Sequence, residues 1–163
     1  MTTRKHFGTE EKPKPIKFKV IKPVFETLTV MDEVSSYFSN NRYTDPQQVF
    51  DAFQWLQRET KEWFLSLHLD GKNRIVCIDV ISIGSLNQSI VHPRETFKTA
   101  LLSSAAAIIL VHNHPSGDPT PSHEDLSITR RLREAGEILG VKVLDHIIVG
   151  EERYFSFADE GLL

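Results

Sequence analysis

The sequence predicts an α/β domain in which a mixed β-sheet is flanked by helices. An apolar run at residues 105–111 is typical of a strand that is buried on both faces. Residues 63–69 alternate, and a turn at residues 70–73 leads into a second apolar run at residues 75–83, which indicates a hairpin. The chain has 163 residues, of which 40% are hydrophobic. This length suits one compact core and is short for two typical domains.

Two helices are expected in the first two thirds of the chain. Asp45 caps the first, Pro46 occupies its first turn, and apolar residues at helical spacing continue to about Thr60. Pro93 begins the second, which extends over residues 94–103 and precedes the apolar strand. Proline suits a first helical turn because its missing N–H would have no partner there.

A third helix is predicted to begin at Ser122 and to end at Gly140, since glycine is common just after the last helical residue. Strands at residues 141–149 and 154–157 then complete the sheet. We expect the inner side of this helix to carry Leu126, Leu132, Ala135 and Leu139.

Two histidines end the buried strand. His112 and His114 share one face because side chains alternate along a strand, which places their Cα atoms roughly 7 Å apart. A loop with four Pro and Gly residues follows, and the helix start at Ser122 brings Asp125 back as an oxygen ligand. Two imidazoles and one carboxylate leave a fourth tetrahedral position for water, as in catalytic zinc sites. The pattern indicates one Zn²⁺ per chain, bound by His112, His114 and Asp125.

A simpler interpretation of the same residues stays open. Isolated His-x-His pairs are common, and Ser122 with Asp125 matches a capping box, in which each side chain bonds the backbone N–H of the other. One carboxylate is not expected to serve a helix cap and a metal easily. The order of strand, paired histidines, proline-stiffened loop and helix start favours the metal site.

The spacing His-x-His, seven residues, Ser, two residues, Asp resembles the signature of the JAMM (MPN-domain) metallopeptidases. The similarity extends over roughly residues 45–158, and it implies an MPN/JAB-like fold, layered like cytidine deaminases, with zinc-dependent peptidase or isopeptidase activity. A short form without the helix-hairpin-helix module of long RadC proteins is expected. The segments most similar to the bacterial RadC branch are Val91-His92-Pro93-Arg94-Glu95, His112-Asn113-His114-Pro115-Ser116-Gly117-Asp118 and Leu144-Asp145-His146-Ile147-Ile148-Val149-Gly150.

The resemblance also implies roles for residues outside the ligand set. Glu62 matches the carboxylate that serves as general base, with Glu59 and Glu95 as alternatives. Ser122 would polarise the scissile carbonyl or stabilise its developing oxyanion, and a plain N-cap remains the alternative. Asn113 replaces the Ser or Thr of ubiquitin-processing members, which weakens the expectation of a ubiquitin-like substrate. Three other histidines, His92, His123 and His146, are expected to pack, to cap a helix or to support the ligands from behind, and Asp118 is expected to shape the loop.

Several function classes are excluded by composition. A single cysteine, Cys77, rules out a disulfide framework and the Pro-Cys-x-x-Cys motif of zinc deaminases. Adjacent histidines in one strand differ from the dispersed motif of HNH nucleases. No signal peptide and no apolar run of about 20 residues is found, so we expect a cytoplasmic protein without membrane contact.

Charge is divided unevenly, which supports a second hypothesis. Residues 1–22 carry seven basic and two acidic side chains, whereas the remainder carries twelve basic and twenty acidic ones. We expect residues 1–40 to form an extension that is basic and flexible over residues 1–15, and residues 41–163 to form the domain. Residues 16–21 alternate and predict an edge strand. The hypothesis is a nucleic-acid-associated accessory protein, related to DNA repair as the resemblance to RadC proteins implies, with a structural or vestigial metal site. A zinc hydrolase that acts on a peptide or protein is the favoured hypothesis, because it accounts for the complete set of metal ligands. In that case the basic arm, residues 1–22, is expected to bind nucleic acid only weakly.

Overall fold

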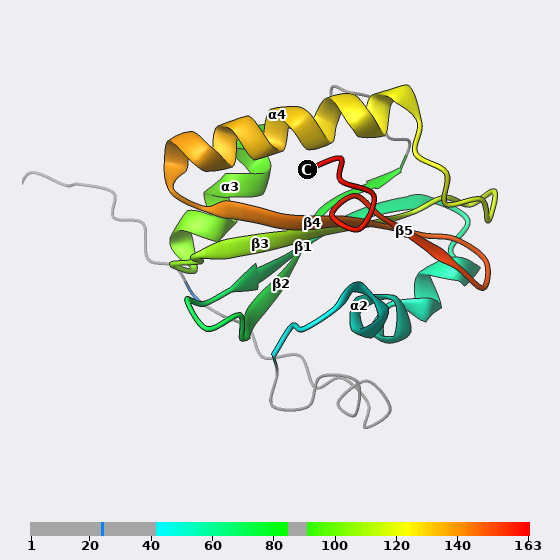
Figure 1. Cartoon of the computed structure of the whole chain (residues 1–163), viewed down its shortest axis with the longest axis horizontal. Helices are drawn as coiled ribbons and strands as arrows, with labels where there is room; N and C mark the ends of the chain where they lie inside the picture. Colours follow the sequence, from blue (N-terminus) through cyan, green and yellow to red (C-terminus); the bar gives the residue numbers. More distant parts are fainter. Residues whose placement is uncertain (1–23, 25–41, 85–90) are drawn as a thin grey trace, which may run out of the picture.

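The computed structural model describes residue 24 and residues 42–84 and 91–163. The expected strand at residues 16–21 and the basic arm lie outside the described residues, and the domain boundary near residue 40 stays a prediction. Figure 1 shows one sheet with helices on both faces. The described elements are α2 (Pro46–Ala52), the 3-10 helix η2 (Gln54–Arg58), β1 (Glu62–Leu69), β2 (Ile75–Gly84), α3 (Pro93–Leu102), β3 (Ala107–Asn113), α4 (His123–Leu139), β4 (Lys142–Val149) and β5 (Tyr154–Ser156).

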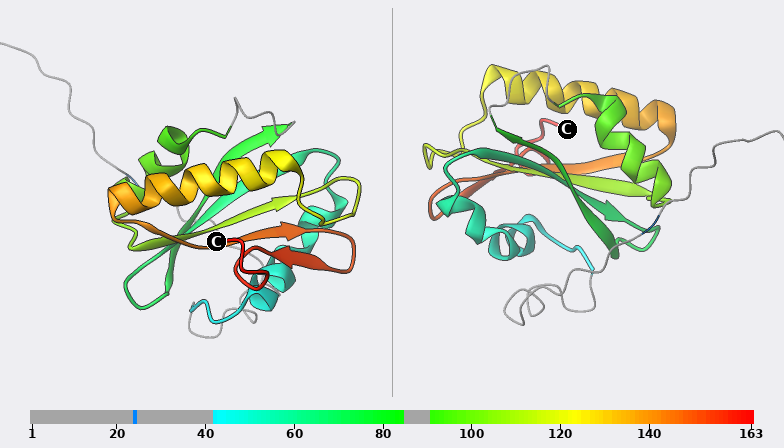
Figure 2. Two further views of the ribbon diagram at one scale, coloured as in Figure 1. Left: turned by 45° about the horizontal axis from the view of Figure 1, so that its top comes forward. Right: turned by 180° about the vertical axis from the view of Figure 1, so that it is seen from behind.

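The five-stranded sheet is mixed, with the strand order β2-β1-β3-β4-β5. β1 pairs antiparallel with β2 and β3, whereas β3 and β4 run parallel. Parallel strands cannot be joined by a tight turn, so the chain crosses over the sheet as α4. Asn113 pairs with Val149, so β3 and β4 end at the same edge of the sheet, and α4 begins there (Figure 2). The predicted α/β class with a mixed sheet flanked by helices is confirmed.

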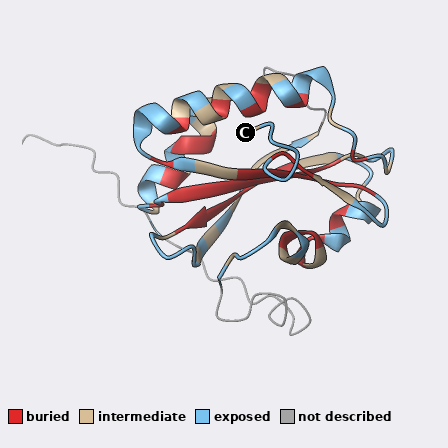
Figure 3. Cartoon of the chain, viewed as in Figure 1, coloured by how far each residue is buried: buried red, intermediate tan, exposed pale blue. Residues whose placement is uncertain are grey.

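Alternation along β1 divides the interior into two cores. Leu65 and Leu67 belong to the core beneath α2 and η2, whereas Phe64 belongs to the core between the sheet and the helices α3 and α4. Every residue of β3 is buried, as its continuous apolar run predicts (Figure 3). Each fully buried Leu or Phe contributes about 1.5 to 3 kcal/mol. The central strands are therefore a rigid support for side chains at their ends.

The first helix differs from the prediction. It ends at Ala52, and a 3-10 helix follows, because the backbone of Phe53 leaves the helical region at φ −110° and ψ 17°. Phe50, Phe53 and Leu56 are all buried at intervals of three residues. A 3-10 helix has three residues per turn, so Leu56 in η2 stays on the same side as Phe53, which precedes it by three residues.

The inner face of α4 is also rotated from the prediction. Leu126 and Leu139 are 39% and 43% exposed, so neither lies on the inner side. Gly136 packs so closely against α3 and the start of β4 that a Cβ there would lie 2.4 Å from the Val141 carbonyl oxygen. The buried residues of α4 are Asp125, Ile128, Thr129, Leu132 and Gly136. Near the start of α4, the polar residues Asp125 and Thr129 are buried in place of the expected Leu126. Among the described residues, no helix combines the length and apolar character needed to cross a membrane.

Candidate metal centre

Three side chains converge where β3 ends and α4 begins. Their nitrogen and oxygen ligand atoms all lie within 4.8 Å of one another, and they belong to His112, His114 and Asp125. The two Nε2 atoms are 3.1 Å apart, His112 Nε2 is 3.2 Å from Asp125 Oδ1, and His114 Nε2 is 3.3 Å from Asp125 Oδ2. His112 and Asp125 are buried, whereas His114 is partly accessible from solvent. The structure thus brings together the three residues that the sequence singled out.

The distances suit a tetrahedral ion. In a zinc site with bonds of about 2.0 to 2.1 Å, neighbouring ligand atoms lie about 3.3 Å apart. The two histidine Nε2 atoms, 3.1 Å apart, are close to this value, and each has one oxygen of the Asp125 carboxylate at a similar distance: Oδ1 lies 3.2 Å from His112 and Oδ2 lies 3.3 Å from His114. Two imidazole nitrogens and one carboxylate oxygen are also donors that zinc accepts, with a fourth position left open. The residues present therefore fit a catalytic zinc ion.

Asp125 completes the helix cap and also contacts both histidines of the cluster. Its Oδ2 accepts hydrogen bonds from the backbone N–H and the hydroxyl of Ser122, both at 2.7 Å, and Ser122 Oγ accepts from the Asp125 N–H at 3.1 Å. Oδ2 accepts both cap bonds and also lies 3.3 Å from His114 Nε2, while Oδ1 lies 3.2 Å from His112 Nε2. The cap thereby fixes the rotamer of a proposed ligand.

The loop between β3 and α4 fixes His114. His114 Nδ1 lies 2.7 Å from the backbone oxygen of Asp118, which can only accept, so in the neutral ring Nδ1 carries the proton and Nε2 has the lone pair that faces the cluster. The Asp118 side chain accepts hydrogen bonds from the N–H and hydroxyl of Thr120 and pairs with Arg153. Asp118 therefore shapes this loop, as the sequence suggested. Gly150 packs directly against this loop, and a Cβ at its position would lie only 2.5 Å from Pro119 Cδ.

Burial and mutual contact tune the charges of the cluster. Burial lowers the pKa of His112, although Asp125 opposes the shift. Burial also acts to lower the pKa of His114, but its hydrogen bonds to Asp125 and the Asp118 carbonyl raise it above the ordinary value. For Asp125, burial is outweighed by the two histidines, which hold its pKa far below the usual range. A permanent carboxylate beside two imidazoles favours a cation at this place.

Glu62 begins β1 beside this cluster. The pairing of Phe64 with His112 places the start of β1 alongside the two histidines, and the Glu62 carboxylate raises the pKa of both, though burial is the larger influence on each. The alternatives are engaged elsewhere. Glu59 accepts a hydrogen bond from the indole of Trp63 at 3.2 Å. Glu95 pairs with cations on the exposed side of α3.

Asn113 holds the backbone on both sides of Glu62. Its side-chain oxygen accepts from the Trp63 N–H at 2.8 Å, and its amide donates to the Lys61 carbonyl at 3.1 Å. Asn113 is buried, and its side chain points away from the cluster, as strand alternation predicts. The two bonds join the peptide groups that precede and follow Glu62. Sequence analysis did not anticipate this clamp, since nothing near Asn113 in the chain identifies its partners 50 residues earlier.

The other histidines also have defined places. His92 caps α3 by accepting a hydrogen bond from the Arg94 N–H, and His123 lies exposed in the first turn of α4. His146 is fully buried in β4, with its Nε2 2.8 Å from His112 Nδ1. His146 therefore contacts a proposed ligand, a role that the sequence left open among packing, capping and support.

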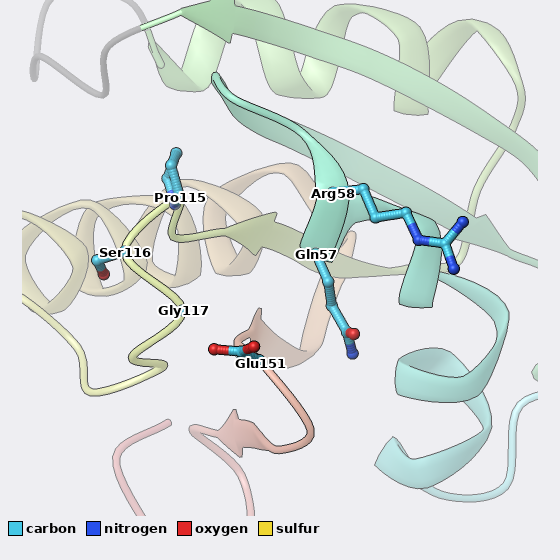
Figure 4. A pocket seen from close by; sticks show the side chains of 6 residues that line it. All are labelled: Gln57, Arg58, Pro115, Ser116, Gly117 and Glu151. Atoms are coloured by element: carbon cyan, nitrogen blue, oxygen red, sulfur yellow. The ribbon is translucent and has the colours of Figure 1, made fainter.

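A pocket of about 430 Å³ lies between η2 and the loop that follows His114. Pro115 and Ser116, which directly follow His114, form one wall, and η2 forms the other (Figure 4). Gln57 points into the space between these walls, whereas the guanidinium of Arg58 points away from Ser116. The complete lining is Gln57, Arg58, Pro115, Ser116, Gly117 and Glu151.

The fold and the cluster together define a class. A mixed five-stranded sheet with helices on both faces, and two histidines and an aspartate where a central strand meets a helix, is the arrangement of a JAB-like domain. The model of the RadC-like JAB domain matches residues 43–162. The chain belongs to the RadC family.

Curated relatives agree with this assignment. The chain is 62% identical over 124 residues to a UPF0758 protein of Pelobacter propionicus, which covers 76% of this chain and 54% of the relative. It is 54% identical over 144 residues to UPF0758 protein GSU0386 of Geobacter sulfurreducens, covering 88% of this chain and 63% of the relative. A UPF0758 protein of Methanosarcina mazei is 51% identical over 123 residues, with coverage of 75% and 54%. The chain thus spans somewhat more than half the length of these relatives, and their names state no reaction.

Proposed function

We propose that this domain is a zinc-dependent hydrolase, of the metallopeptidase or isopeptidase type, that cleaves an amide bond in a peptide or protein. The observation that carries the proposal is the convergence of two histidine nitrogens, 3.1 Å apart, on the Asp125 carboxylate, whose Oδ1 and Oδ2 lie 3.2 and 3.3 Å from them. His112, His114 and Asp125 would hold the ion. Membership of a JAB-domain family supports the same chemistry.

When bound, zinc would lower the pKa of a water to about 7 and polarise an amide carbonyl. Glu62 would take the proton from that water at its carboxylate and deliver it to the leaving amine. The position of Glu62 at the start of β1, where it acts electrostatically on both histidines, supports this role. Asn113 would keep its backbone in place.

Ser122 would assist at the substrate oxygen. Its hydroxyl donates to Asp125 Oδ2, to which the Ser122 backbone N–H donates as well. If the hydroxyl turns toward a substrate carbonyl, the carboxylate oxygen still keeps one donor. The cap and the assisting role are therefore compatible, and a well-placed donor of this kind typically contributes about 10² to 10³ in rate.

Metal content tests the first half of the proposal. Purified protein should hold about one zinc per chain, and His112→Ala, His114→Ala or Asp125→Ala should each lower occupancy sharply, because each removes one of three ligands. Elemental analysis of protein reconstituted with zinc and then desalted would give the ratio. A protein that retains no zinc after this treatment would rule out the site.

Glu62→Gln tests the second half. It should keep the zinc content and reduce turnover by about 10² to 10⁴, enough to retain uncleaved substrate. Mass spectrometry of proteins that accumulate with Glu62→Gln in cells, compared with the wild type, would identify the substrate. Glu59→Gln and Glu95→Gln are matched controls, expected to change little. Loss of zinc from Glu62→Gln would make Glu62 a ligand, and undiminished cleavage would exclude it as the base.

A further inference from the structure

A buried chain of hydrogen bonds runs behind the cluster, from one proposed ligand to the backbone of another. His112 Nδ1 lies 2.8 Å from His146 Nε2, and His146 Nδ1 lies 2.6 Å from Thr129 Oγ1. Thr129 Oγ1 in turn donates to the backbone oxygen of Asp125 at 2.6 Å. His112 and His146 are fully buried and Thr129 is 1% exposed, so water does not compete for these groups.

The backbone oxygen of Asp125, at the end of this chain, determines which atom is the donor in each hydrogen bond. A carbonyl oxygen only accepts, so the single hydroxyl proton of Thr129 goes to Asp125. Thr129 Oγ1 must then accept from His146, which places a proton on His146 Nδ1. A neutral imidazole has one donor nitrogen, so His146 Nε2 accepts, and His112 Nδ1 carries the proton between the two rings.

We propose that Thr129, acting through His146, selects the tautomer of His112 whose Nε2 lone pair faces the metal cluster. Both are positioning residues, since neither reaches the cluster itself. The proposal rests on the proposed function, because a free lone pair at Nε2 matters only for a metal ligand. His114 reaches the same state through a different acceptor, the Asp118 carbonyl. The Nε2 lone pairs of both histidines thus face the same metal cluster.

The surroundings of His146 support this assignment. Phe157 stacks on the His146 ring with centroids 4.8 Å apart and planes at 17°, and Phe64 packs against it at 63°. These rings hold the imidazole plane so that its nitrogens point to Thr129 and His112. His146 is fully buried between these rings, with one nitrogen facing the Thr129 hydroxyl and the other facing His112 Nδ1.

Nuclear magnetic resonance of the metal-free protein tests the proposal directly. Long-range ¹H–¹⁵N correlation spectra at about pH 8, above the ordinary histidine pKa of about 6.5, distinguish the two tautomers of each ring. We expect His112 and His146 both to carry the proton on Nδ1. A wild-type His112 protonated on Nε2 alone would overturn the proposal, whatever the metal content of the protein.

Substitutions at Thr129 test the consequence for the metal. Thr129→Val keeps the shape but removes the acceptor for His146, so His112 should lose its tautomer preference and the affinity for zinc should fall about 10- to 100-fold. Thr129→Ser should restore both. Zinc affinity would be measured by competition with a chelator, with folding checked by circular dichroism.

Thr96→Val is the matched control. Thr96 is another buried helical threonine whose hydroxyl donates to the carbonyl four residues earlier, that of His92, at 3.4 Å. It should leave zinc affinity unchanged. Equal affinities of wild type and Thr129→Val would refute the positioning role, and so would an equal loss in Thr96→Val. Failure of the wild type itself to bind zinc would refute the proposed function, while the tautomer measurement would still decide whether Thr129 and His146 orient His112.

Discussion

Replacing Asn113 by alanine removes both hydrogen bonds that hold the backbone around Glu62. Each bond contributes about 0.5 to 1.5 kcal/mol net, and a buried group left without a partner costs about 1 to 3 kcal/mol. Lys61 is exposed, so water can replace the amide at its carbonyl, whereas the half-buried Trp63 N–H has less access to solvent. We therefore expect Asn113→Ala to lower the free energy of unfolding by about 2 kcal/mol.

Urea denaturation of the metal-free protein, followed by Trp fluorescence, would measure this loss. Asn113→Asp is the informative companion, because it keeps an acceptor for the Trp63 N–H but sets a carboxylate against the Lys61 carbonyl. Zinc content should remain at wild-type level in both variants, since the Asn113 side chain points away from the ligands. A loss below about 0.5 kcal/mol in Asn113→Ala would show that solvent satisfies both backbone groups, and the clamp would then have no energetic role.

Four further outcomes are expected. Gly150→Ala should displace the loop that carries the Asp118 carbonyl, since the new Cβ would lie 2.5 Å from Pro119 Cδ. The substitution should lower the free energy of unfolding by about 1 to 3 kcal/mol and should also lower the affinity for zinc. If neither quantity changes, Gly150 is not packed against the loop in this way. Ser122→Ala should cost about 1 kcal/mol of stability as a lost cap, and a larger proportional loss of turnover would distinguish the assisting role from the cap alone. The metal-free protein should lose stability as the pH falls below about 6.5, because His146 has a depressed pKa when folded and takes up its proton only on unfolding. This group makes the free energy of unfolding fall by about 1.4 kcal/mol per pH unit, and His146→Phe should reduce that slope in denaturation experiments at several pH values. If residues 1–22 bind nucleic acid, binding should weaken steeply with salt and vanish when they are deleted; tight binding that survives the deletion would favour the accessory-protein hypothesis.

Short sequence patterns predicted most of the helices and strands because capping and hydrophobic alternation involve residues that are close together in the chain. The continuous apolar run of β3, the glycine after α4 and the capping residues at Asp45 and Ser122 all lie where the sequence placed them. The grouping of His112 and His114 was predictable for the same reason, since strand alternation alone puts them on one face.

Relations between distant segments were not predictable from these patterns. The Asn113 clamp joins residues about 50 positions apart, and the partnership of Thr129 with His146 depends on how α4 lies across β4. The inner face of α4 was wrongly predicted because hydrophobic spacing takes no account of polar residues that turn inward at a site. The contacts of the Asp125 carboxylate with both the helix cap and the histidines likewise depend on the positions of its individual oxygens.

The hydrogen bonds around the cluster bear on how the domain would acquire its ion. Each proposed ligand is oriented by a protein group: His112 by His146, His114 by the Asp118 carbonyl, and Asp125 by the cap at Ser122. Small zinc modules fold only when the metal arrives, because nothing else holds their ligands together. Here we expect the ion to enter and leave a folded protein, so a chelator should abolish hydrolysis reversibly while the unfolding transition persists.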